Sequence, residues 1–389
     1  MQANHLGLIS CFHWNDRPIR YLWHMSDATK NQNHSGPVKP KVLVIGGGFA
    51  GIQFISTLDQ KRFDVLLIDK LNHHQFQPLF YQVATSQLEP SSISFPFRNV
   101  FKGKKNVQIR LADVSEVDRA NNKVITNIGE FYYDYLVIAV GCKTNFFGNS
   151  QLEENTFTLK TTYDAITVRN HILQTFETII SASNEEKESL LNLVIVGAGP
   201  TGVELAGAFA EIKKDVLPND YPGINFSEFN VHLVEGSPNT LNNMSEKAKK
   251  ASKKYLQKMG VLVQTETFVK DYNGDTLTLS TGATIKSKTV IWAAGVIGNQ
   301  IGGFAEEMME RGHKFKVNRT NKVKQCDNIF ALGDIAYMET PKYPNGHPQV
   351  ANVAINQAKL LAKNLKRKFQ KRPLENFEYK VLGFFMALF

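Results

Sequence analysis

The sequence predicts an α/β protein built from two Rossmann-like dinucleotide-binding domains, the second inserted into the first. Two motifs of the form G-x-G-x-x-G, at residues 46–51 and 197–202, predict this fold. Each motif follows a short apolar run, precedes a helix-like stretch, and is followed by another apolar run that ends in an acid. A lone motif is weak evidence, but all of these features in one unit indicate a nucleotide-binding turn.

The first unit begins with the apolar, mostly β-branched residues 42–45, which predict a buried parallel strand. Gly46 allows the tight turn, Gly48 lets a pyrophosphate approach the backbone, and Gly51 lets helix and strand pack closely. The phosphates are expected at the helix N-terminus, where free N–H groups and the dipole favour anions. Asp69 ends the next strand and is expected to accept hydrogen bonds from the ribose hydroxyls of an adenosine.

The second unit repeats these features with its own motif and its own terminal acid, Glu235. That carboxylate would repel a 2′-phosphate, so the second unit is expected to prefer NADH to NADPH. Residues 215–229 lengthen this unit relative to the first and contain two prolines, which predicts a surface insertion. Residues 349–368 predict a final helix.

The composition is that of an ordinary globular protein, with 389 residues, 42% of them hydrophobic, and a formal net charge of +9. The densest basic run, residues 363–372, suits either a solvated helix face or an anionic membrane surface. No aromatic–basic RNA motif accompanies it, so nucleic-acid binding is not predicted. The three cysteines, Cys11, Cys142 and Cys326, form no C-x-x-C pair and predict neither a metal site nor a redox-active dithiol.

A Gly333-Asp334 pair follows another predicted strand, at residues 328–332. An aspartate in that position can accept hydrogen bonds from the sugar-alcohol chain of a flavin. A flavin beside a nicotinamide implies hydride transfer, which the cofactors carry out themselves. The helix at 349–368 could direct its positive N-terminal end at the flavin, where negative charge develops.

Six segments of the chain are informative together, at residues 46–51, 73–85, 140–148, 197–204, 292–296 and 331–334. They resemble those of type II NADH dehydrogenases, which belong to the FAD-dependent pyridine nucleotide-disulfide oxidoreductases. These are single-chain, non-proton-pumping NADH:quinone oxidoreductases bound to a membrane face. The resemblance runs from about residue 41 to residue 379, and its most specific part is F-Q-P-L-F-Y-Q-V-A-T at residues 76–85.

The resemblance implies that the first unit binds FAD, the second binds NADH, and Glu204 lies beside the nicotinamide. The family carries two quinone-facing glutamines on the helix near the flavin, where this chain has Asn352 and Asn356. These asparagines share a helix face, and each is one methylene shorter. The implied FAD-binding residues are Gly46, Gly48, Gly51, Asp69, Thr85, Gly141, Gly333 and Asp334. The implied NADH-binding residues are Gly197, Gly199, Gly202, Glu235 and Gly295.

The resemblance also implies an arrangement of domains and a location. The expected divisions are an accessory N-terminal extension (1–39), the first part of the FAD domain (40–155), the NADH domain (156–297), the second part of the FAD domain (298–368) and an incomplete C-terminal segment (369–389). The implied location is peripheral, on the cytoplasmic face of a respiratory membrane, with a quinone as electron acceptor and a homodimer as one option. The match stops near Tyr379, so the membrane-binding part is expected to be truncated, and a protein without it would be soluble.

Other readings of the sequence stay open. One is an NADH-dependent flavin reductase with another acceptor, such as a ferredoxin-like protein or another partner without a disulfide. Another is an inactive, truncated product. A disulfide reductase or a sulfide:quinone reductase needs a reactive cysteine pair, so Cys142 and Cys326 would have to meet in space.

Overall fold

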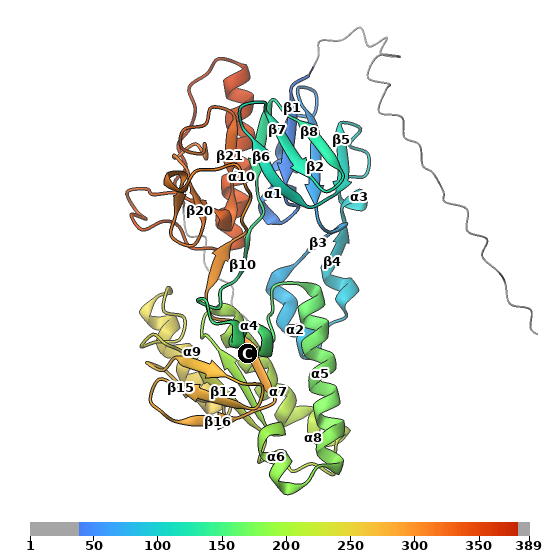
Figure 1. Ribbon diagram of the computed structural model, residues 1–389, viewed down its shortest axis with the longest axis vertical. Coiled ribbons are helices and arrows are strands. Elements are labelled where there is room, and N and C mark those ends of the chain that lie inside the picture. The colour runs from blue at the N-terminus through green and yellow to red at the C-terminus, as the bar shows by residue number, and fades with distance from the viewer. Residues whose placement is uncertain (1–38, 380–389) are drawn as a thin grey trace, which may run out of the picture. The chain divides into compact units, whose positions relative to one another are not determined.

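A computed structural model of the chain describes residues 39–379 (Figure 1). Most of the predicted N-terminal extension, residues 1–38, and the end of the predicted C-terminal segment, residues 380–389, lie outside the described residues. Within the described part, no helix is both long enough and apolar enough to cross a membrane.

A parallel five-stranded sheet, in the order β21-β9-β1-β2-β5, forms the centre of the first unit. Its strands are β1 (Lys41–Ile45), β2 (Asp64–Asp69), β5 (Val107–Leu111), β9 (Tyr135–Ile138) and β21 (Ile329–Ala331). Side chains alternate along each strand, so Val42 and Val44 face one side of the sheet while Leu43 and Ile45 face the other. Helices α1 (Phe49–Thr57) and α10 (Ala351–Phe369) cover the first side.

The other side of this sheet packs against residues of a small antiparallel sheet and of the chain segment after residue 300. The antiparallel sheet consists of β6 (Val114–Asp118), β7 (Lys123–Thr126) and β8 (Gly129–Tyr132). The later segment contains η3 (Glu306–Met308), β19 (Met309–Glu310), β20 (Lys314–Lys316), η4 (Gly333–Ile335) and β22 (Ala336–Tyr337). The first unit is therefore completed by residues that follow the second unit in the chain.

The second unit repeats this plan around a parallel four-stranded sheet in the order β13-β12-β11-β17. Its strands are β11 (Asn192–Val196), β12 (Asn230–Val234), β13 (Leu262–Gln264) and β17 (Thr289–Trp292). One side packs on a cluster with residues from α5 (Thr162–Ser181), α7 (Pro200–Asp215) and α9 (Glu246–Lys258). The other packs on an antiparallel sheet of β14 (Val269–Tyr272), β15 (Thr276–Leu279) and β16 (Thr284–Lys286).

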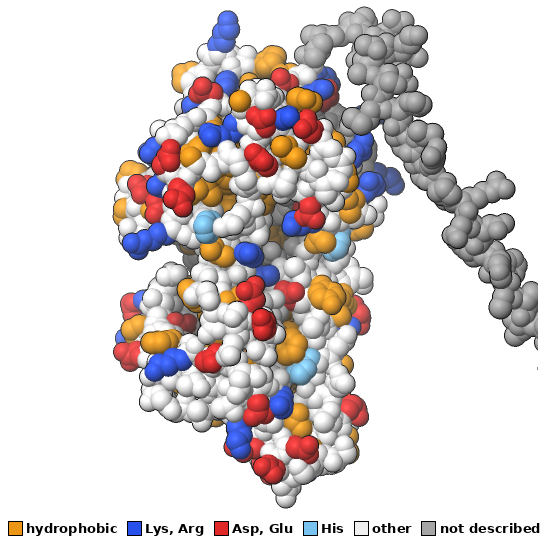
Figure 2. Space-filling model, viewed as in Figure 1, with side chains coloured by type: hydrophobic (Ala, Val, Ile, Leu, Met, Phe, Trp, Pro, Cys, Tyr) orange, Lys and Arg blue, Asp and Glu red, His pale blue; other side chains and the backbone are white. Residues whose placement is uncertain are grey.

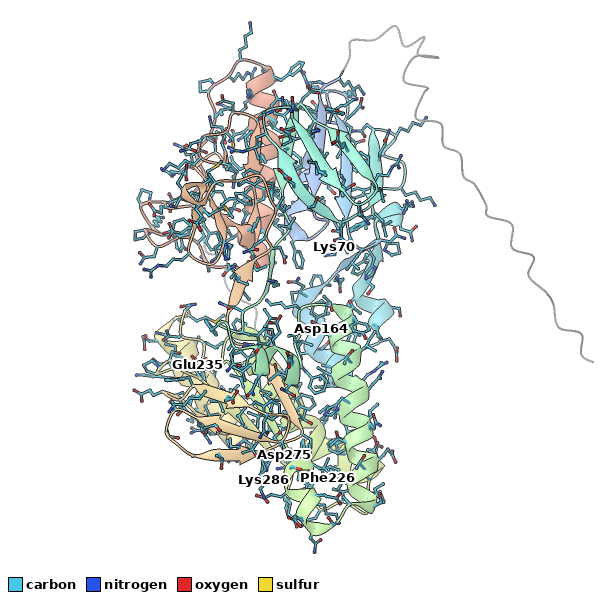
Figure 3. All side chains as sticks on the ribbon, viewed as in Figure 1. Lys70, Asp164, Phe226, Glu235, Asp275 and Lys286 are labelled. Carbon is cyan, nitrogen blue, oxygen red and sulfur yellow. The ribbon has the colours of Figure 1, made fainter. Side chains whose placement is uncertain are left out.

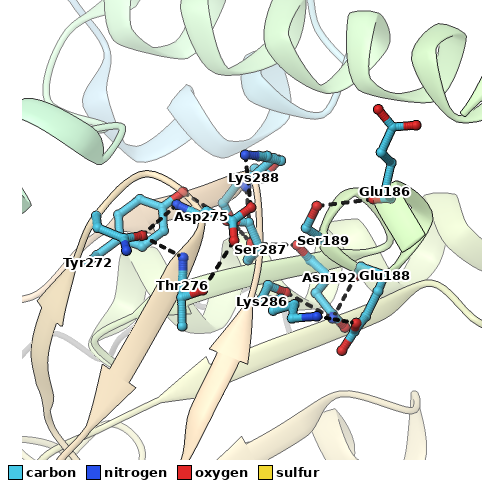
Figure 4. A network of polar contacts seen from close by, with 12 residues as sticks. Glu186, Glu188, Ser189, Asn192, Tyr272, Asp275, Thr276, Lys286, Ser287 and Lys288 are labelled. Carbon is cyan, nitrogen blue, oxygen red and sulfur yellow. Dashed lines mark hydrogen bonds and ion pairs between the residues drawn. The ribbon is translucent and has the colours of Figure 1, made fainter. Parts of the chain in front are cut away.

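A buried polar network fastens this antiparallel sheet to strand β11 (Figure 4). The Ser287 hydroxyl donates to the Asn192 carbonyl at 2.6 Å, and the Tyr272 hydroxyl donates to the Ser287 carbonyl at 2.9 Å. Lys288 and Asp275 form an ion pair at 2.8 Å nearby. Burial raises the pKa of Tyr272 to about 12, so its hydroxyl stays protonated as a donor over the physiological range.

The chain passes between the two units through an antiparallel pair, β10 (Cys142–Thr144) with β18 (Val296–Gly298). Between β10 and β11 lie α4 (Ser150–Asn155), α5 and α6 (Asn184–Leu190). The predicted domain boundaries stay predictions.

The mixture of aromatic and amide side chains at residues 72–85 predicts a long loop that covers a ligand, but most of this segment has regular structure. It forms β3 (His73–Gln75), η1 (Gln77–Leu79) and α2 (Phe80–Ala84). Strand β3 pairs with β4 (Ser94–Pro96), which follows η2 (Pro90–Ile93) and precedes α3 (Phe97–Val100). Helix α2 buries its apolar residues in the same cluster as α5 and α7, so hydrophobic burial fixes this segment.

Residues 215–229 are likewise more than the predicted surface insertion. They contain α8 (Leu217–Asp220) and place two aromatic rings in the core. Phe226, labelled in Figure 3, and Phe229 have ring centroids 5.7 and 5.4 Å from that of Phe176 on α5. Edge-to-face packing of this kind anchors the segment against the helices of the second unit.

Three of the six basic residues in the run at residues 363–372 form ion pairs within the described part of the chain. Lys363 and Arg367 both pair with Glu375, at 2.6 and 3.0 Å. Lys366 lies 3.9 Å from Asp59. Basic and acidic side chains are also interspersed on the face seen in Figure 2. These ion pairs are compatible with a solvated helix face, and the alternative of an anionic membrane surface stays a prediction.

Candidate functional site

The two glycine turns have the same construction. Gly46 and Gly197 adopt left-handed backbone angles, with φ of +98° and +102°. A Cβ atom at Gly46 would collide with the Ala139 carbonyl, and one at Gly197 with the backbone of Ala294. The third glycines, at the start of α1 and α7, lie against the carbonyls of Gly46 and Gly197 in the same way. These positions need glycine for the turn itself and for close helix–strand packing.

The second glycines differ, because a Cβ atom added at Gly48 or Gly199 would meet nothing within 4 Å. Each residue is the N-cap of its helix, α1 or α7, and neither helix has a side-chain cap. Free N–H groups therefore face open space at both helix N-termini, which suits the pyrophosphate of a dinucleotide. The residues present thus fit two dinucleotides, one for each turn.

The acids at the ends of β2 and β12 lie beside these turns. Asp69 accepts a 2.6 Å hydrogen bond from the Gly47 N–H, and Glu235 accepts one of the same length from the Ala198 N–H. Burial raises the pKa of Asp69, although backbone N–H groups oppose this. Figure 3 labels Glu235 at its position in the second unit. The sequence pattern predicts the ribose-binding position of these acids but not their role in holding the turn.

The Gly333-Asp334 pair follows β21 and lies against the start of α10. The Gly333 N–H donates to the buried Gln357 side chain at 2.8 Å. The Gln349 amide, just before α10, donates to the Asp334 carbonyl at 3.2 Å. Burial raises the pKa of the Asp334 carboxyl group. Neither glutamine was among the predicted site residues, although Gln357 shares the helical spacing of inward-facing Ala354 and Leu361 on α10.

The two cysteines within residues 39–379 are both free and have different neighbours. Cys142 accepts a hydrogen bond from the Gln349 amide at 3.1 Å, and burial raises its pKa to about 12. Cys326 is buried in the core cluster on the far side of the first sheet from α10 and lies beside Arg119. No dithiol pair therefore forms within the described residues, which argues against the two cysteine-dependent alternatives.

Glu204 lies on α7, shortly after the second glycine motif, and is partly buried. Burial raises its pKa from 4.5 to about 7, so the carboxyl group can hold or release a proton near neutral pH. Tyr81 of α2 lies close enough that the Glu204 charge contributes to raising the tyrosine pKa. The packing of α2 on α7 thus places a residue of the first unit beside the predicted nicotinamide-facing acid.

The remaining predicted residues occupy varied positions. The Thr85 hydroxyl donates to the Tyr81 carbonyl at 2.9 Å and caps α2. Gly141 and Gly295 have φ of +65° and +72°. They directly precede β10 and β18, the two strands that connect the units. Asn352 is exposed and Asn356 partly buried on α10. The cofactor and quinone roles of these residues stay predictions.

These observations define the chain as a two-dinucleotide α/β protein with a polar cluster at the start of its last helix. Residues 40–358 match the pyridine nucleotide-disulphide oxidoreductase family. A type II NADH:quinone oxidoreductase of Mycobacterium tuberculosis is 33% identical over 88% of this chain and 77% of its own length. The chain therefore belongs to this family of oxidoreductases and, within it, to the type II NADH:quinone oxidoreductases.

Further relatives agree with this membership. A type II NADH:quinone oxidoreductase of Staphylococcus aureus is 28% identical over 88% of this chain and 85% of its own length. The structure of NDH2 from Plasmodium falciparum in complex with NADH has the same fold, with a TM-score of 0.81 at 21% identity. That likeness covers 88% of this chain and 87% of the other.

Proposed function

We propose that this protein is a flavoenzyme that takes a hydride from NADH and passes the electrons to a quinone. The observation that carries the proposal is the duplicated turn, in which Gly48 and Gly199 leave open space at two helix N-termini. Two such sites suit two dinucleotides, and membership in the family supports FAD and NADH as those dinucleotides. When bound, the FAD would accept a hydride from NADH and donate electrons to the quinone.

The first unit offers the FAD site. Free N–H groups at the start of α1 would bind the pyrophosphate, and Asp69 would hold the adenosine ribose. Asp334, beside the start of α10, would accept hydrogen bonds from the sugar-alcohol chain. The N-terminus of α10 carries no side-chain cap, so its positive end is free to stabilise negative charge at the flavin.

The second unit offers the NADH site. The start of α7 would bind the pyrophosphate, and Glu235 would hold the ribose and oppose a 2′-phosphate. Glu204 would lie next to the nicotinamide. With a pKa of about 7, it can hold a proton on one of its carboxyl oxygens or release it while electrons pass through the site.

The acceptor side rests on α10 and on family membership. The Asn352 and Asn356 amides would contact the quinone carbonyl groups directly or through water. We propose peripheral attachment to the cytoplasmic face of a membrane, because a long-tailed quinone is delivered from a bilayer. Flotation with anionic vesicles tests this attachment, and sedimentation tests the homodimer.

One experiment tests the redox function directly. Purified protein is mixed anaerobically with NADH while the visible spectrum is recorded, and a soluble quinone is then added. We expect a flavin spectrum that NADH bleaches and the quinone restores. A spectrum that NADH bleaches but no quinone restores would favour a reductase with another acceptor. Failure of NADH to bleach a bound flavin would overturn the proposal.

A further inference from the structure

Phe147 is an aromatic residue that the fold keeps exposed in an unfavourable backbone conformation. It lies between β10 and α4, is 70% exposed, and has a left-handed φ of +54°. This conformation is uncommon for a bulky residue and raises the energy of the folded protein. Leu241 also has a left-handed φ, but its side chain is buried in the core, which compensates for the strain. Burial gives no such compensation at Phe147, so the exposed ring needs another explanation.

Hydrogen bonds hold the turn that contains Phe147 on the end of β17. The Phe147 N–H donates to the Asn145 side-chain oxygen at 2.9 Å, and the Trp292 ring N–H donates to the Asn145 carbonyl at 3.0 Å. The Asn145 N–H donates to the Gly295 carbonyl at 3.4 Å. The ring centroids of Phe146 and Trp292 are 5.9 Å apart, which adds an aromatic contact. These contacts give the Phe147 ring a defined place.

That place adjoins the second glycine turn. The tip of the Phe147 ring lies against Gly295, because a Cβ atom added at Gly295 would come within 2.7 Å of it. A Cβ atom added at Gly197 would come within 2.8 Å of the Ala294 backbone, so the segment after β17 packs directly on the glycine turn. Thr201, in the first turn of α7, and Gly295 also line the same small cavity. The ring is therefore close to the helix N-terminus that would bind the pyrophosphate of NADH.

The strand order indicates which half of a dinucleotide would reach Phe147. Strands β12 and β17 flank β11 on opposite sides, and the glycine turn follows β11. Parallel strands end at one edge of the sheet, and a dinucleotide lies across this edge with its pyrophosphate at the glycine turn. Glu235, after β12, would hold the adenosine ribose, so the adenosine half extends toward β12. The nicotinamide half therefore extends toward β17 and the Phe147 ring.

We propose that the Phe147 ring packs against the nicotinamide half of bound NADH. This inference rests on the proposed function, and it assigns a binding role to a residue outside the glycine motifs. An aromatic ring offers a flat apolar surface to the nicotinamide ring. A ring already held at the turn also loses little conformational freedom when the dinucleotide binds. The left-handed backbone at Phe147 then serves to present this surface to the dinucleotide.

Titration calorimetry of the flavin-loaded protein with NAD⁺ and with ADP tests this assignment, because ADP contains the adenosine half and the pyrophosphate but no nicotinamide. Phe147→Ala is expected to weaken NAD⁺ binding about tenfold and to leave ADP binding unchanged. Phe147→Tyr keeps the ring and should retain the affinity for NAD⁺. Tyr255→Ala removes a half-exposed ring from α9 in the same unit and should change neither affinity. Without nucleotide, Phe147→Ala should melt at the same temperature as the unmodified protein, because the ring is exposed.

Equal affinities for NAD⁺ in Phe147→Ala and the unmodified protein would overturn the inference. An equal loss of affinity for NAD⁺ and ADP would also overturn it, and a lowered melting temperature would then assign that loss to the glycine turn. Binding of these nucleotides to the oxidised protein requires no electron transfer. A selective loss of NAD⁺ affinity in a protein whose flavin NADH cannot reduce would therefore refute the proposed function alone. Absence of NAD⁺ binding by the unmodified protein would refute both.

Discussion

The Ala198 N–H and the Glu235 carboxylate are joined by a 2.6 Å hydrogen bond that ties the second glycine turn to the end of β12. The other carboxylate oxygen of Glu235 accepts a 2.7 Å hydrogen bond from the Ser237 N–H. Gly47 and Asp69 form the equivalent contact in the first unit, also at 2.6 Å. Because two backbone groups hold Glu235, its charge cannot swing away from a nucleotide bound at the turn.

This fixed charge predicts a strong preference for NADH. A 2′-phosphate next to Glu235 would meet a like charge at a cost of about 1–3 kcal/mol in a partly solvated site. We expect kcat/KM for NADH to exceed that for NADPH at least tenfold. Glu235→Gln should lower this ratio. Glu266→Gln serves as the control, because it neutralises an exposed carboxylate on a residue whose backbone N–H donates to the Ser237 carbonyl. Equal kcat/KM values for the two nucleotides in the unmodified protein would contradict the assignment.

Asp334 is predicted to hold the flavin. Replacing it with alanine would leave a buried hydroxyl of the sugar-alcohol chain without its acceptor, at a cost of about 1–3 kcal/mol. FAD occupancy of Asp334→Ala after dialysis should therefore fall, as measured from the ratio of flavin to protein absorbance. Asp327→Ala is a suitable control, because the Asp327 side chain is fully exposed and, among residues 39–379, forms an ion pair only with Lys322. Full FAD occupancy in Asp334→Ala would show that Asp334 serves only the turn and does not hold the flavin.

The raised pKa of Glu204 predicts that the stability of the folded protein depends on pH. Burial raises the pKa of Glu204 in the folded protein from 4.5 to about 7. Between these two pH values the folded protein keeps a proton that the unfolded chain has lost. The contribution of Glu204 to stability is thus fully present below pH 4.5 and is lost as the pH rises through 7. Glu204→Gln removes the ionisation. It should match the unmodified protein in melting temperature at about pH 5 and exceed it at pH 8.

The control for this comparison is Glu211→Gln, which changes another glutamate on the same helix, α7. Melting temperatures are measured in the apoprotein, so that nucleotide binding does not contribute. A Glu204→Gln protein whose melting temperature follows the unmodified protein at both pH values would show that this carboxyl group titrates normally.

Replacement of Ser287 by alanine is expected to destabilise the second unit. Its side chain is fully buried, and its hydroxyl donates to the Asn192 carbonyl at 2.6 Å and accepts the Thr289 N–H at 3.0 Å. Ser287→Ala leaves both backbone groups without this partner, so we expect a loss of about 1–3 kcal/mol in unfolding free energy. Trp292 on β17 reports the unfolding of this sheet by fluorescence. The exposed Ser91→Ala is the control, and an equal urea midpoint for both variants would contradict the prediction.

The sequence predicts the repeated units well because their pattern is local. Strand, glycine turn, helix and terminal acid are contiguous, and β1 covers residues 42–45, which hydrophobic patterning indicates as a strand. Tertiary burial overrides local pattern elsewhere. Residues 76–85 contain polar amides that suggest a loop, yet Phe80 and Val83 belong to the same core cluster as residues of α7.

Long-range contacts account for the site residues that the sequence does not reveal. The Gln357 side chain accepts a hydrogen bond from the Gly333 N–H, and the Gln349 amide donates one to Cys142, which is far away in the chain. No spacing rule along one chain reports such meetings, since they depend on how the second unit returns to the first through β18.

The last prediction concerns electron transfer to the quinone. Asn352 and Asn356 lie one turn apart on α10, and Gln357 beside them faces inward to Gly333. Each asparagine retains the amide donor and acceptor of the family's glutamine but reaches about 1.5 Å less far. A quinone carbonyl would then be held through water or loosely. We therefore expect slow turnover with a long-tailed quinone, and we expect the double change Asn352→Gln with Asn356→Gln to raise kcat/KM for the quinone.

Hydride transfer from NADH involves neither asparagine, so the rate of flavin bleaching in anaerobic stopped flow should be the same in the double variant and the unmodified protein. Lys359→Gln introduces a glutamine at an exposed position on the same helix and should change neither rate. Fast quinone turnover in the unmodified protein would refute the idea that reach limits the acceptor step. An unchanged kcat/KM for the quinone in the double variant would place the limit elsewhere, because the two longer amides restore the geometry that the family uses on this face of α10.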